Sequence, residues 1–197
     1  MRLQTDEIGV ATLILILLAW IGFAAIFLFR RKSSKSEETK RSPRATIGIA
    51  LQSASFALVW GFLRPVWWPF SPSRAAELVL GGITVVLAYA SCWFCLRAVR
   101  TLGKQWTYAA RVIKGHELIT QGPYSIVRNP IYLGMFGLIL ATGLALSRWW
   151  ALLAAVVIFL IGNRIRIRAE EQLLRETFGP QFDDYARRVP AFLPRLL

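Results

Sequence analysis

Five long stretches of this 197-residue chain contain no charged residue, and they limit how the chain can fold. The first four hold 22, 19, 19 and 19 residues and the fifth holds 15; they cover 8–29, 45–63, 78–96, 129–147 and 149–163. At 1.5 Å per residue, about 20 helical residues cross the hydrocarbon core of a bilayer, which is roughly 30 Å thick. With 55% hydrophobic and only 18% charged residues, the chain is also too apolar for an ordinary soluble domain. We therefore predict an all-α integral membrane protein with five transmembrane helices.

Two further features complete the predicted architecture: a short link between the last two stretches, and a polar tail after the fifth. Only Ser147 and Arg148 separate the fourth and fifth stretches, so these helices should form a tight antiparallel hairpin. After the fifth stretch, the segment NRIRIRAEEQLLRETFG continues with helical character and reaches Gly179 and Pro180, which typically end a helix. We expect this segment to form a cytoplasmic C-terminal helical tail.

The net charge of +13 is better explained by membrane topology than by nucleic-acid binding. Twenty of the 24 Lys and Arg residues fall in the linker 30–44, the segment 97–128 and the tail 164–197. Because cytoplasmic segments carry an excess of basic residues, we predict an external N-terminus and a cytoplasmic C-terminus. The linker 30–44 is rich in Ser, Lys and Glu, so we expect it to be mobile and attracted to anionic membrane lipids.

A polar site can form only outside the uncharged stretches, at the cytoplasmic interface. We therefore divide the chain into 1–100, with three transmembrane helices and a basic linker, and 101–197, a cofactor-binding and catalytic region. Cys92 and Cys95 lie within the third stretch, where a thiolate is not stabilised, so we interpret the sequence CWFC as packing residues. The sequence offers no metal site.

The segment GHELITQGPYSIVRNPIYLG, residues 115–134, specifies the start of the fourth helix. Asn129 can serve as its N-cap and Pro130 as its first helical residue. A turn at Gly122 and Pro123 would bring Tyr124, Arg128 and the only histidine, His116, toward this helix start. The free backbone N–H groups of a helix start suit an anionic ligand.

Two faces of the helical tail carry charged residues. At 100° per residue, Arg166 and Glu170 share one face, and their order is the less favourable one for supporting a helix. These side chains therefore form either a structural pair or part of a site. Glu171 follows Arg168 by three residues and precedes Arg175 by four, so we interpret the second face as a solvated ladder of salt bridges.

Structural roles compete with functional ones at each candidate position. His116 could be a surface or packing residue, Tyr124 and Tyr132 could be interfacial anchors, and Arg128 could mark the membrane boundary. Gly134, Gly137 and Ala141 are interpreted as small residues that let helices approach closely.

Two segments, GHELITQGPYSIVRNPIYLG and RIRAEEQLLRETFGPQFDDYARRVPAFLP, together resemble the isoprenylcysteine carboxyl methyltransferase family and related membrane phospholipid methyltransferases. The resemblance covers about residues 103–194. It implies that bound S-adenosylmethionine lies along His116, Glu117, Leu118 and Ile119, in a pocket completed by Tyr124, Asn129, Pro130, Ile131 and Tyr132. It also implies that Glu170 holds a polar part of this cofactor and that Arg166 meets the substrate as the catalytic residue.

Two positions depart from the family pattern. Asn129 stands where the family usually has histidine, so a contact that needs an imidazole is lost, although an amide can still donate a hydrogen bond. Phe182 stands where tyrosine is common, which removes one hydroxyl group from the tail.

The residue types suit methyl transfer to a lipophilic acceptor that enters from the bilayer. The resemblance favours a prenylated or other hydrophobic carboxylate, which is already ionised at neutral pH and needs alignment rather than a base. A phospholipid amine is the second candidate. From another class, membrane sterol reductases have a similar tyrosine-containing helix start and use NADPH, and a non-enzymatic scaffold is a third alternative.

Overall fold

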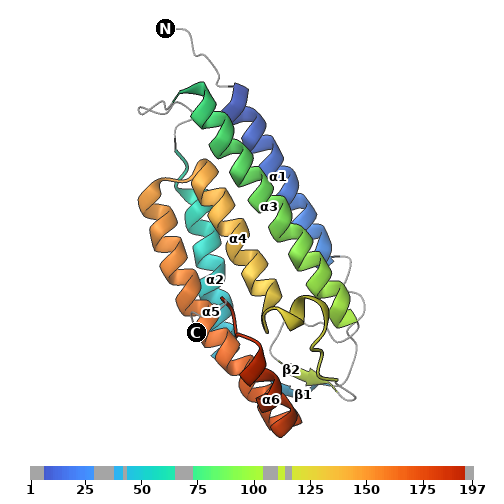
Figure 1. The fold of residues 1–197 in the computed structure, drawn as a ribbon. Helices are drawn as coiled ribbons and strands as arrows, with labels where there is room; N and C mark the ends of the chain where they lie inside the picture. Colours follow the sequence, from blue (N-terminus) through green and yellow to red (C-terminus); the bar gives the residue numbers. More distant parts are fainter. Residues whose placement is uncertain are drawn as a thin grey trace.

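The computed structural model describes residues 7–28, 38–41, 44–64, 73–103, 111–113 and 117–193 (Figure 1). Within these ranges the chain forms six α-helices, one short 3-10 helix and two short strands. The helices are α1 (Glu7–Leu28), α2 (Arg44–Gly61), α3 (Arg74–Leu102), η3 (Gly122–Ser125), α4 (Pro130–Leu146), α5 (Trp149–Phe178) and α6 (Pro180–Arg188); the strands are β1 (Glu38–Arg41) and β2 (Arg111–Ile113).

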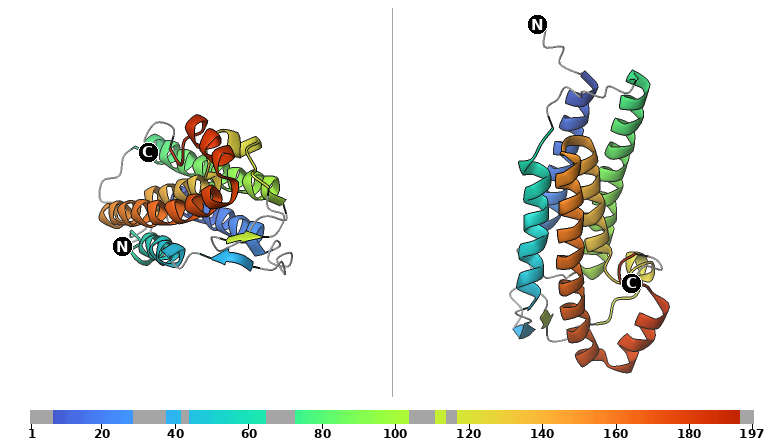
Figure 2. Two further views of the ribbon diagram at one scale, coloured as in Figure 1. Left: turned by 90° about the horizontal axis from the view of Figure 1, so that it is seen from below. Right: turned by 90° about the vertical axis from the view of Figure 1, so that its left-hand side faces the viewer.

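The five long helices lie side by side in an elongated bundle (Figures 1 and 2). Helix α3 packs against both α1 and α4, whereas α2 packs mainly along α5. One core cluster, centred on Ile139 and Phe159, joins α2, α4 and α5. A second cluster, which includes Ile16, Ala88 and Leu138, joins α1, α3 and α4. Helix α4 therefore contributes to both parts of the core.

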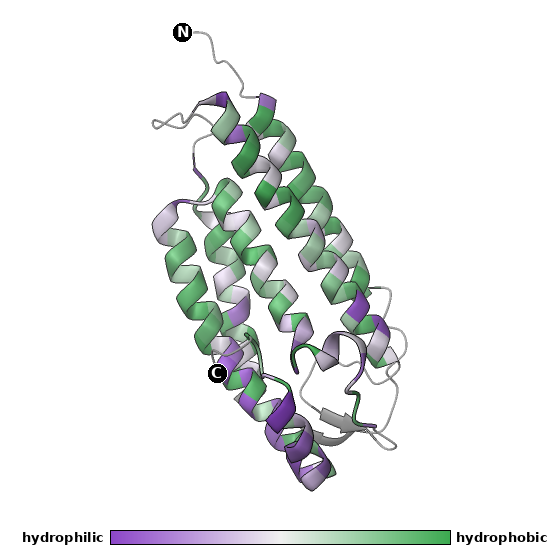
Figure 3. Cartoon of the chain, viewed as in Figure 1, coloured by the Kyte–Doolittle hydropathy of each residue, from purple (hydrophilic) through white to green (hydrophobic). Residues whose placement is uncertain are grey.

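The apolar character of the bundle agrees with a membrane environment (Figure 3). Helices α1, α3 and α5, with 22, 29 and 30 residues, are long and apolar enough to cross a bilayer. The apolar segments Ala45–Gly61 and Pro130–Leu146 are shorter. Large hydrophobic side chains such as Ile21, Val86 and Leu153 are exposed on the outer faces of the bundle. The prediction of a helical, membrane-type protein is confirmed, whereas five complete crossings remain a prediction.

The tight turn predicted between the fourth and fifth stretches is present, because α4 ends at Leu146 and α5 begins at Trp149. Arg64, just beyond α2, donates from Nη2 to the carbonyl oxygens of Leu144 (2.6 Å) and Ala145 (2.8 Å). A cation at this position satisfies carbonyl groups that the end of a helix leaves without partners. Arg64 thereby ties the end of α2 to the hairpin.

The short antiparallel pair of β1 and β2 was not predicted. The linker 30–44 was expected to be mobile throughout, but its residues 38–41 pair with 111–113 of the later polar segment. The fold class remains all-α, and this one strand pair was missed because strands of three or four residues carry no recognisable alternation.

The close approach of α3 and α4 explains the small residues in both helices. A Cβ atom added at Gly134 would collide with the Cys95 sulfur, and one added at Gly137 would collide with the hydroxyl group of Ser91. Cys95 is fully buried, and its thiol donates to the carbonyl oxygen of Ile131 (3.4 Å). The interpretation of CWFC and of these glycines as packing residues agrees with this arrangement.

Candidate active site

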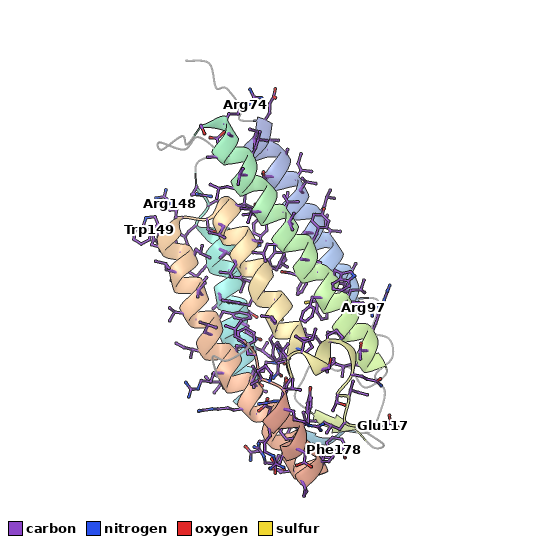
Figure 4. All side chains as sticks on the ribbon, viewed as in Figure 1. Arg74, Arg97, Glu117, Arg148, Trp149 and Phe178 are labelled. Carbon is purple, nitrogen blue, oxygen red and sulfur yellow. The ribbon has the colours of Figure 1, made fainter. Side chains whose placement is uncertain are left out.

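The start of α4 lies at the end of the bundle opposite to the hairpin turn, where Figure 4 also places Glu117 and Phe178. Asn129 occupies the N-cap position and Pro130 the first helical position, as predicted. The side chain of Asn129, however, does not cap the helix. Its amide nitrogen instead donates to the carbonyl oxygen of Ala191 (2.8 Å) and lies 3.4 Å from Glu171 Oε1. The predicted side-chain cap was therefore wrong, because this amide bonds to Ala191 in the segment after α6.

Glu170 links the start of α4 to the C-terminal part of α5. Its Oε1 atom accepts hydrogen bonds from the Tyr132 hydroxyl (2.5 Å) and from Arg166 Nε (3.1 Å). The Arg166 guanidinium also lies over the Tyr132 ring, with Cζ 4.8 Å from the ring centroid, which is a cation–π geometry. The three side chains form one network. The contact between Arg166 and Glu170 agrees with the prediction that these residues share one face of the helix.

This network continues to α2. Arg166 Nη1 donates to Gln52 Oε1 (3.1 Å), and Gln52 Nε2 donates to Asn163 Oδ1 (3.3 Å). Gln52 and Asn163 are both buried. Sequence reasoning missed both residues, because each is a single neutral polar residue within an uncharged stretch.

Glu171 and Arg128 form a second, separate ion pair. Arg128 Nε lies 2.8 Å from Glu171 Oε1 and Nη2 lies 3.0 Å from Oε2, which is a two-point contact. The two side chains are 12% and 14% exposed. Arg175, the expected partner, instead pairs with Asp183 at 2.7 Å. The interpretation of Glu171 as part of a solvated ladder was therefore wrong. The paired glutamates of the family motif, Glu170 and Glu171, were the signal in the sequence that Glu171 has a specific partner.

The same arginine holds the last described segment of the chain. Arg128 Nη1 donates to the carbonyl oxygens of Ala186 (2.8 Å) and Val189 (2.5 Å). The backbone N–H of Arg128 donates to the carbonyl oxygen of Pro190 (2.9 Å). Beyond these residues, Phe192 is fully buried in the core cluster that contains Tyr132. We call residues 180–193, which comprise α6 and the segment after it, the C-terminal arm. Arg128 and Phe192 fasten this arm to the bundle.

A cleft of about 420 Å³, part of it open to solvent, lies beside the ion pair of Arg128 and Glu171. Its lining combines apolar side chains with a few polar ones: Leu102, Glu117, Leu118, Ile119, Tyr124, Arg128, Asn129, Glu171, Leu174, Phe182 and Tyr185. Five of the predicted cofactor residues are in this set, namely Glu117, Leu118, Ile119, Tyr124 and Asn129.

The other predicted residues lie next to the cleft or outside the described residues. Pro130, Ile131, Tyr132 and Glu170 do not line the cleft, but they belong to the adjacent helix start and its network. His116 falls outside the described residues. The structure thus brings most of the predicted residues to one end of the bundle, in two neighbouring groups.

Two buried tyrosines fix the wall of the cleft. The Tyr185 hydroxyl of α6 donates to the carbonyl oxygen of Tyr124 (2.6 Å). Burial raises the pKa of Tyr185 to about 12 and raises the pKa of Tyr124. Both phenols therefore stay neutral at physiological pH, and the bond between α6 and η3 persists.

Comparison with known proteins assigns the fold around this site to a family. Residues 77–181, from α3 to the start of α6, match the family model described as phospholipid methyltransferase. The chain belongs to this family. The resemblance to isoprenylcysteine carboxyl methyltransferases and their phospholipid-modifying relatives is thereby confirmed.

Individual relatives of this family member cover much of its length. A nickel-cobalt-cadmium resistance protein from Alcaligenes xylosoxydans xylosoxydans is 36% identical over 157 residues, which are 78% of this chain and 66% of that protein. Protein-S-isoprenylcysteine O-methyltransferase from Saccharomyces cerevisiae is 32% identical over 141 residues (70% and 58%). Protein-S-isoprenylcysteine O-methyltransferase B from Arabidopsis thaliana is 32% identical over 99 residues (49% and 50%). The chain spans between one half and two thirds of the length of these relatives.

Proposed function

We propose that this chain is an integral membrane methyltransferase that uses S-adenosylmethionine and methylates a lipophilic carboxylate. The observation that carries the proposal is the network of Tyr132, Glu170 and Arg166 beside a partly apolar cleft, in a member of the phospholipid methyltransferase family. Relatives named as isoprenylcysteine O-methyltransferases support the choice of a carboxylate acceptor attached to a lipid.

The residues around the cleft fit the chemistry of this cofactor. Leu118, Ile119 and Tyr124 offer apolar and aromatic surface to an adenosine group, and Glu117 supplies an acidic group. No side chain caps the first turn of α4, so the backbone N–H groups of Ile131 and Tyr132 lack the bond that a cap would provide. These N–H groups suit the carboxylate of the cofactor. Glu170 is the acidic group assigned to the cofactor's ammonium or ribose, and His116 is proposed as a further contact.

Positioning should supply most of the catalysis. When bound, S-adenosylmethionine supplies a methyl group made electrophilic by its sulfonium. Arg166 can hold the acceptor carboxylate through a planar guanidinium, whose direction Glu170 and Tyr132 fix. Held in this way, a carboxylate oxygen would point toward the methyl group that the cofactor would supply. No proton moves, so the chain needs no general base.

A phospholipid amine is the second candidate acceptor, because the matching family model is described by phospholipid methylation. An amine must lose a proton in the reaction, so a base would be required. The family match does not favour the NADPH-dependent reductase alternative. Among the described residues, no group of three or more His, Cys, Asp or Glu could hold a metal ion, so we carry no metal site over from the metal-resistance relative.

Calorimetry tests the cofactor class. We expect detergent-purified protein to bind S-adenosylhomocysteine with micromolar affinity, a binding free energy on the order of 8 kcal/mol, and not to bind NADPH. Binding of NADPH alone would replace the methyltransferase proposal with the reductase. Turnover of a farnesylated cysteine derivative, compared with phosphatidylethanolamine, separates the two acceptor classes.

We also propose five membrane crossings, with the N-terminus outside and the C-terminus and active site in the cytoplasm. At 1.5 Å per residue the 17 residues of α4 extend about 26 Å, slightly less than the hydrocarbon core. The excess of basic residues at the end of the bundle near α6 supports the orientation. A green fluorescent protein fused after residue 197 should fluoresce in bacterial cells, whereas alkaline phosphatase fused there should be inactive; the reverse result would invert the topology.

A further inference from the structure

Gln52 is the part of the polar network that the proposed function leaves unexplained. It lies on α2, outside the residues 77–181 that match the family model. The residue is 2% exposed, and both ends of its amide are bonded, the oxygen to Arg166 Nη1 (3.1 Å) and the nitrogen to Asn163 Oδ1 (3.3 Å). A buried amide that is bonded at both ends is held in one orientation.

Two glycines set the distance at which Gln52 reaches Arg166. A Cβ atom at Gly48 would lie 2.8 Å from Arg166 Cβ, and one at Gly162 would lie 2.7 Å from Leu51 Cβ. Real Cβ atoms do not approach other atoms so closely, so larger residues would push α2 away from α5. The close crossing therefore places the Gln52 amide against the guanidinium.

The charge of this network also matters. The Arg166 guanidinium contacts Glu170, the face of the Tyr132 ring and Gln52. Gln52 accepts a hydrogen bond from the guanidinium without adding a second negative charge. A glutamate at the same position would accept the same bond but would place two carboxylates against one guanidinium, and this would oppose an anionic acceptor.

We propose that Gln52 is a positioning residue that fixes the direction of Arg166 and, by being neutral, makes the site select an anionic acceptor over a neutral one. This inference rests on the proposed function and takes its carboxylate acceptor as given. It also gives α2 a part in the reaction site.

Two variants of Gln52 test the two parts of the inference in the full-length protein, with N-acetyl-S-farnesyl-L-cysteine as the acceptor probe. Gln52→Leu should lower kcat/KM roughly tenfold to a hundredfold, the range for losing a hydrogen bond to a charged group. It should leave the affinity for S-adenosylhomocysteine unchanged within about twofold, because the bond between Tyr132 and Glu170 remains. Gln52→Glu should raise KM for the carboxylate probe roughly tenfold, with a smaller change in kcat.

Ser55→Ala is the matched control. Ser55 is buried one turn further along α2, and its hydroxyl donates to the backbone oxygen of Gln52 rather than to Arg166. This variant should retain wild-type KM and kcat. A double-mutant cycle with Arg166→Lys tests the route of the effect: Gln52→Leu should cost less than about twofold in that background if it acts through the guanidinium.

The possible results separate the inference from the proposed function. If wild-type protein neither binds S-adenosylhomocysteine nor methylates the probe, the proposed function fails and the inference fails with it. If the wild type is active and Gln52→Leu has the same kcat/KM as Ser55→Ala, only the inference is overturned. The same holds if Gln52→Leu lowers kcat/KM by the same factor in the Arg166→Lys background as in the wild type. A KM for the carboxylate probe that is unchanged in Gln52→Glu overturns the selection by charge.

Discussion

Glu170→Ala is expected to lower the affinity for S-adenosylhomocysteine about a hundredfold, the effect of removing a partly buried charged partner. Glu170 is held by the Tyr132 hydroxyl at 2.5 Å and by Arg166 Nε at 3.1 Å, so its carboxylate has a fixed direction in the free protein. Its loss removes the acidic group assigned to the cofactor and leaves the Arg166 guanidinium without its carboxylate. Titration calorimetry of detergent-purified variants measures the loss directly.

Three further variants define the division of roles. Arg166→Ala should keep cofactor affinity and lose turnover, because Glu170 retains its bond to Tyr132. Tyr132→Phe should weaken cofactor binding roughly tenfold, the cost of one hydrogen bond to a charged group. Glu176→Ala, which removes an exposed carboxylate of the same helix that accepts a bond from Gln172 (3.2 Å), should change nothing. An equal loss of cofactor affinity in Arg166→Ala and Glu170→Ala would contradict separate roles for these residues.

The long elements could be predicted because membrane insertion constrains them strongly. An uncharged stretch of about 20 residues has few alternatives to a helix, since a bilayer cannot satisfy open backbone groups. Helix α5 also continues to Phe178 as predicted, and it ends where Gly179 adopts a φ of 49°, a conformation that glycine tolerates better than other residues. Local chemistry was therefore sufficient for the start of α4 and the end of α5, whereas α3 (74–102) extends beyond its uncharged stretch 78–96 at both ends.

The partners of charged residues could not be predicted from local spacing. Helical periodicity correctly placed Arg166 beside Glu170, four residues away. The same reasoning assigned Glu171 to Arg168 and Arg175, yet its partner is 43 residues earlier in the chain. Spacing along a helix shows which residues share a face, but it does not show which other element covers that face.

The same limit applies to residues whose partners come from distant segments. Asn129 stands at the N-cap position, but the segment after α6 passes close enough for its amide to bond to Ala191 instead. Gln52 is unremarkable within its apolar stretch, and only the crossing of α2 with α5 shows its contact with Arg166. Tertiary packing therefore decided the chemical roles that the sequence left open.

Spacing alone would suggest that Glu171→Ala is harmless. We expect it to destabilise the protein by about 3 kcal/mol, the lower end of the range for removing one partner of a buried ion pair, because this pair is largely but not fully buried. Arg128 would lose its two-point contact with the carboxylate while remaining only 12% exposed. It would keep the carbonyl oxygens of Ala186 and Val189 as acceptors, which do not neutralise its charge. The melting temperature in detergent should fall by roughly 10 °C.

The neighbouring ion pair between Arg175 and Asp183 provides a control of the same chemical type in the same region. Its side chains are 53% and 44% exposed, so Arg175→Ala should cost less than about 1 kcal/mol. Replacing both members of the buried pair, as Arg128→Met with Glu171→Leu, should be less destabilising than Glu171→Ala alone, because no buried charge is left without its partner. Hydrogen exchange should show the loss concentrated in the C-terminal arm, since Arg128 binds three of its carbonyl groups. If Glu171→Ala and Arg175→Ala melt at the same temperature, the buried pair does not fasten the arm, and Glu171 behaves as a solvated surface residue.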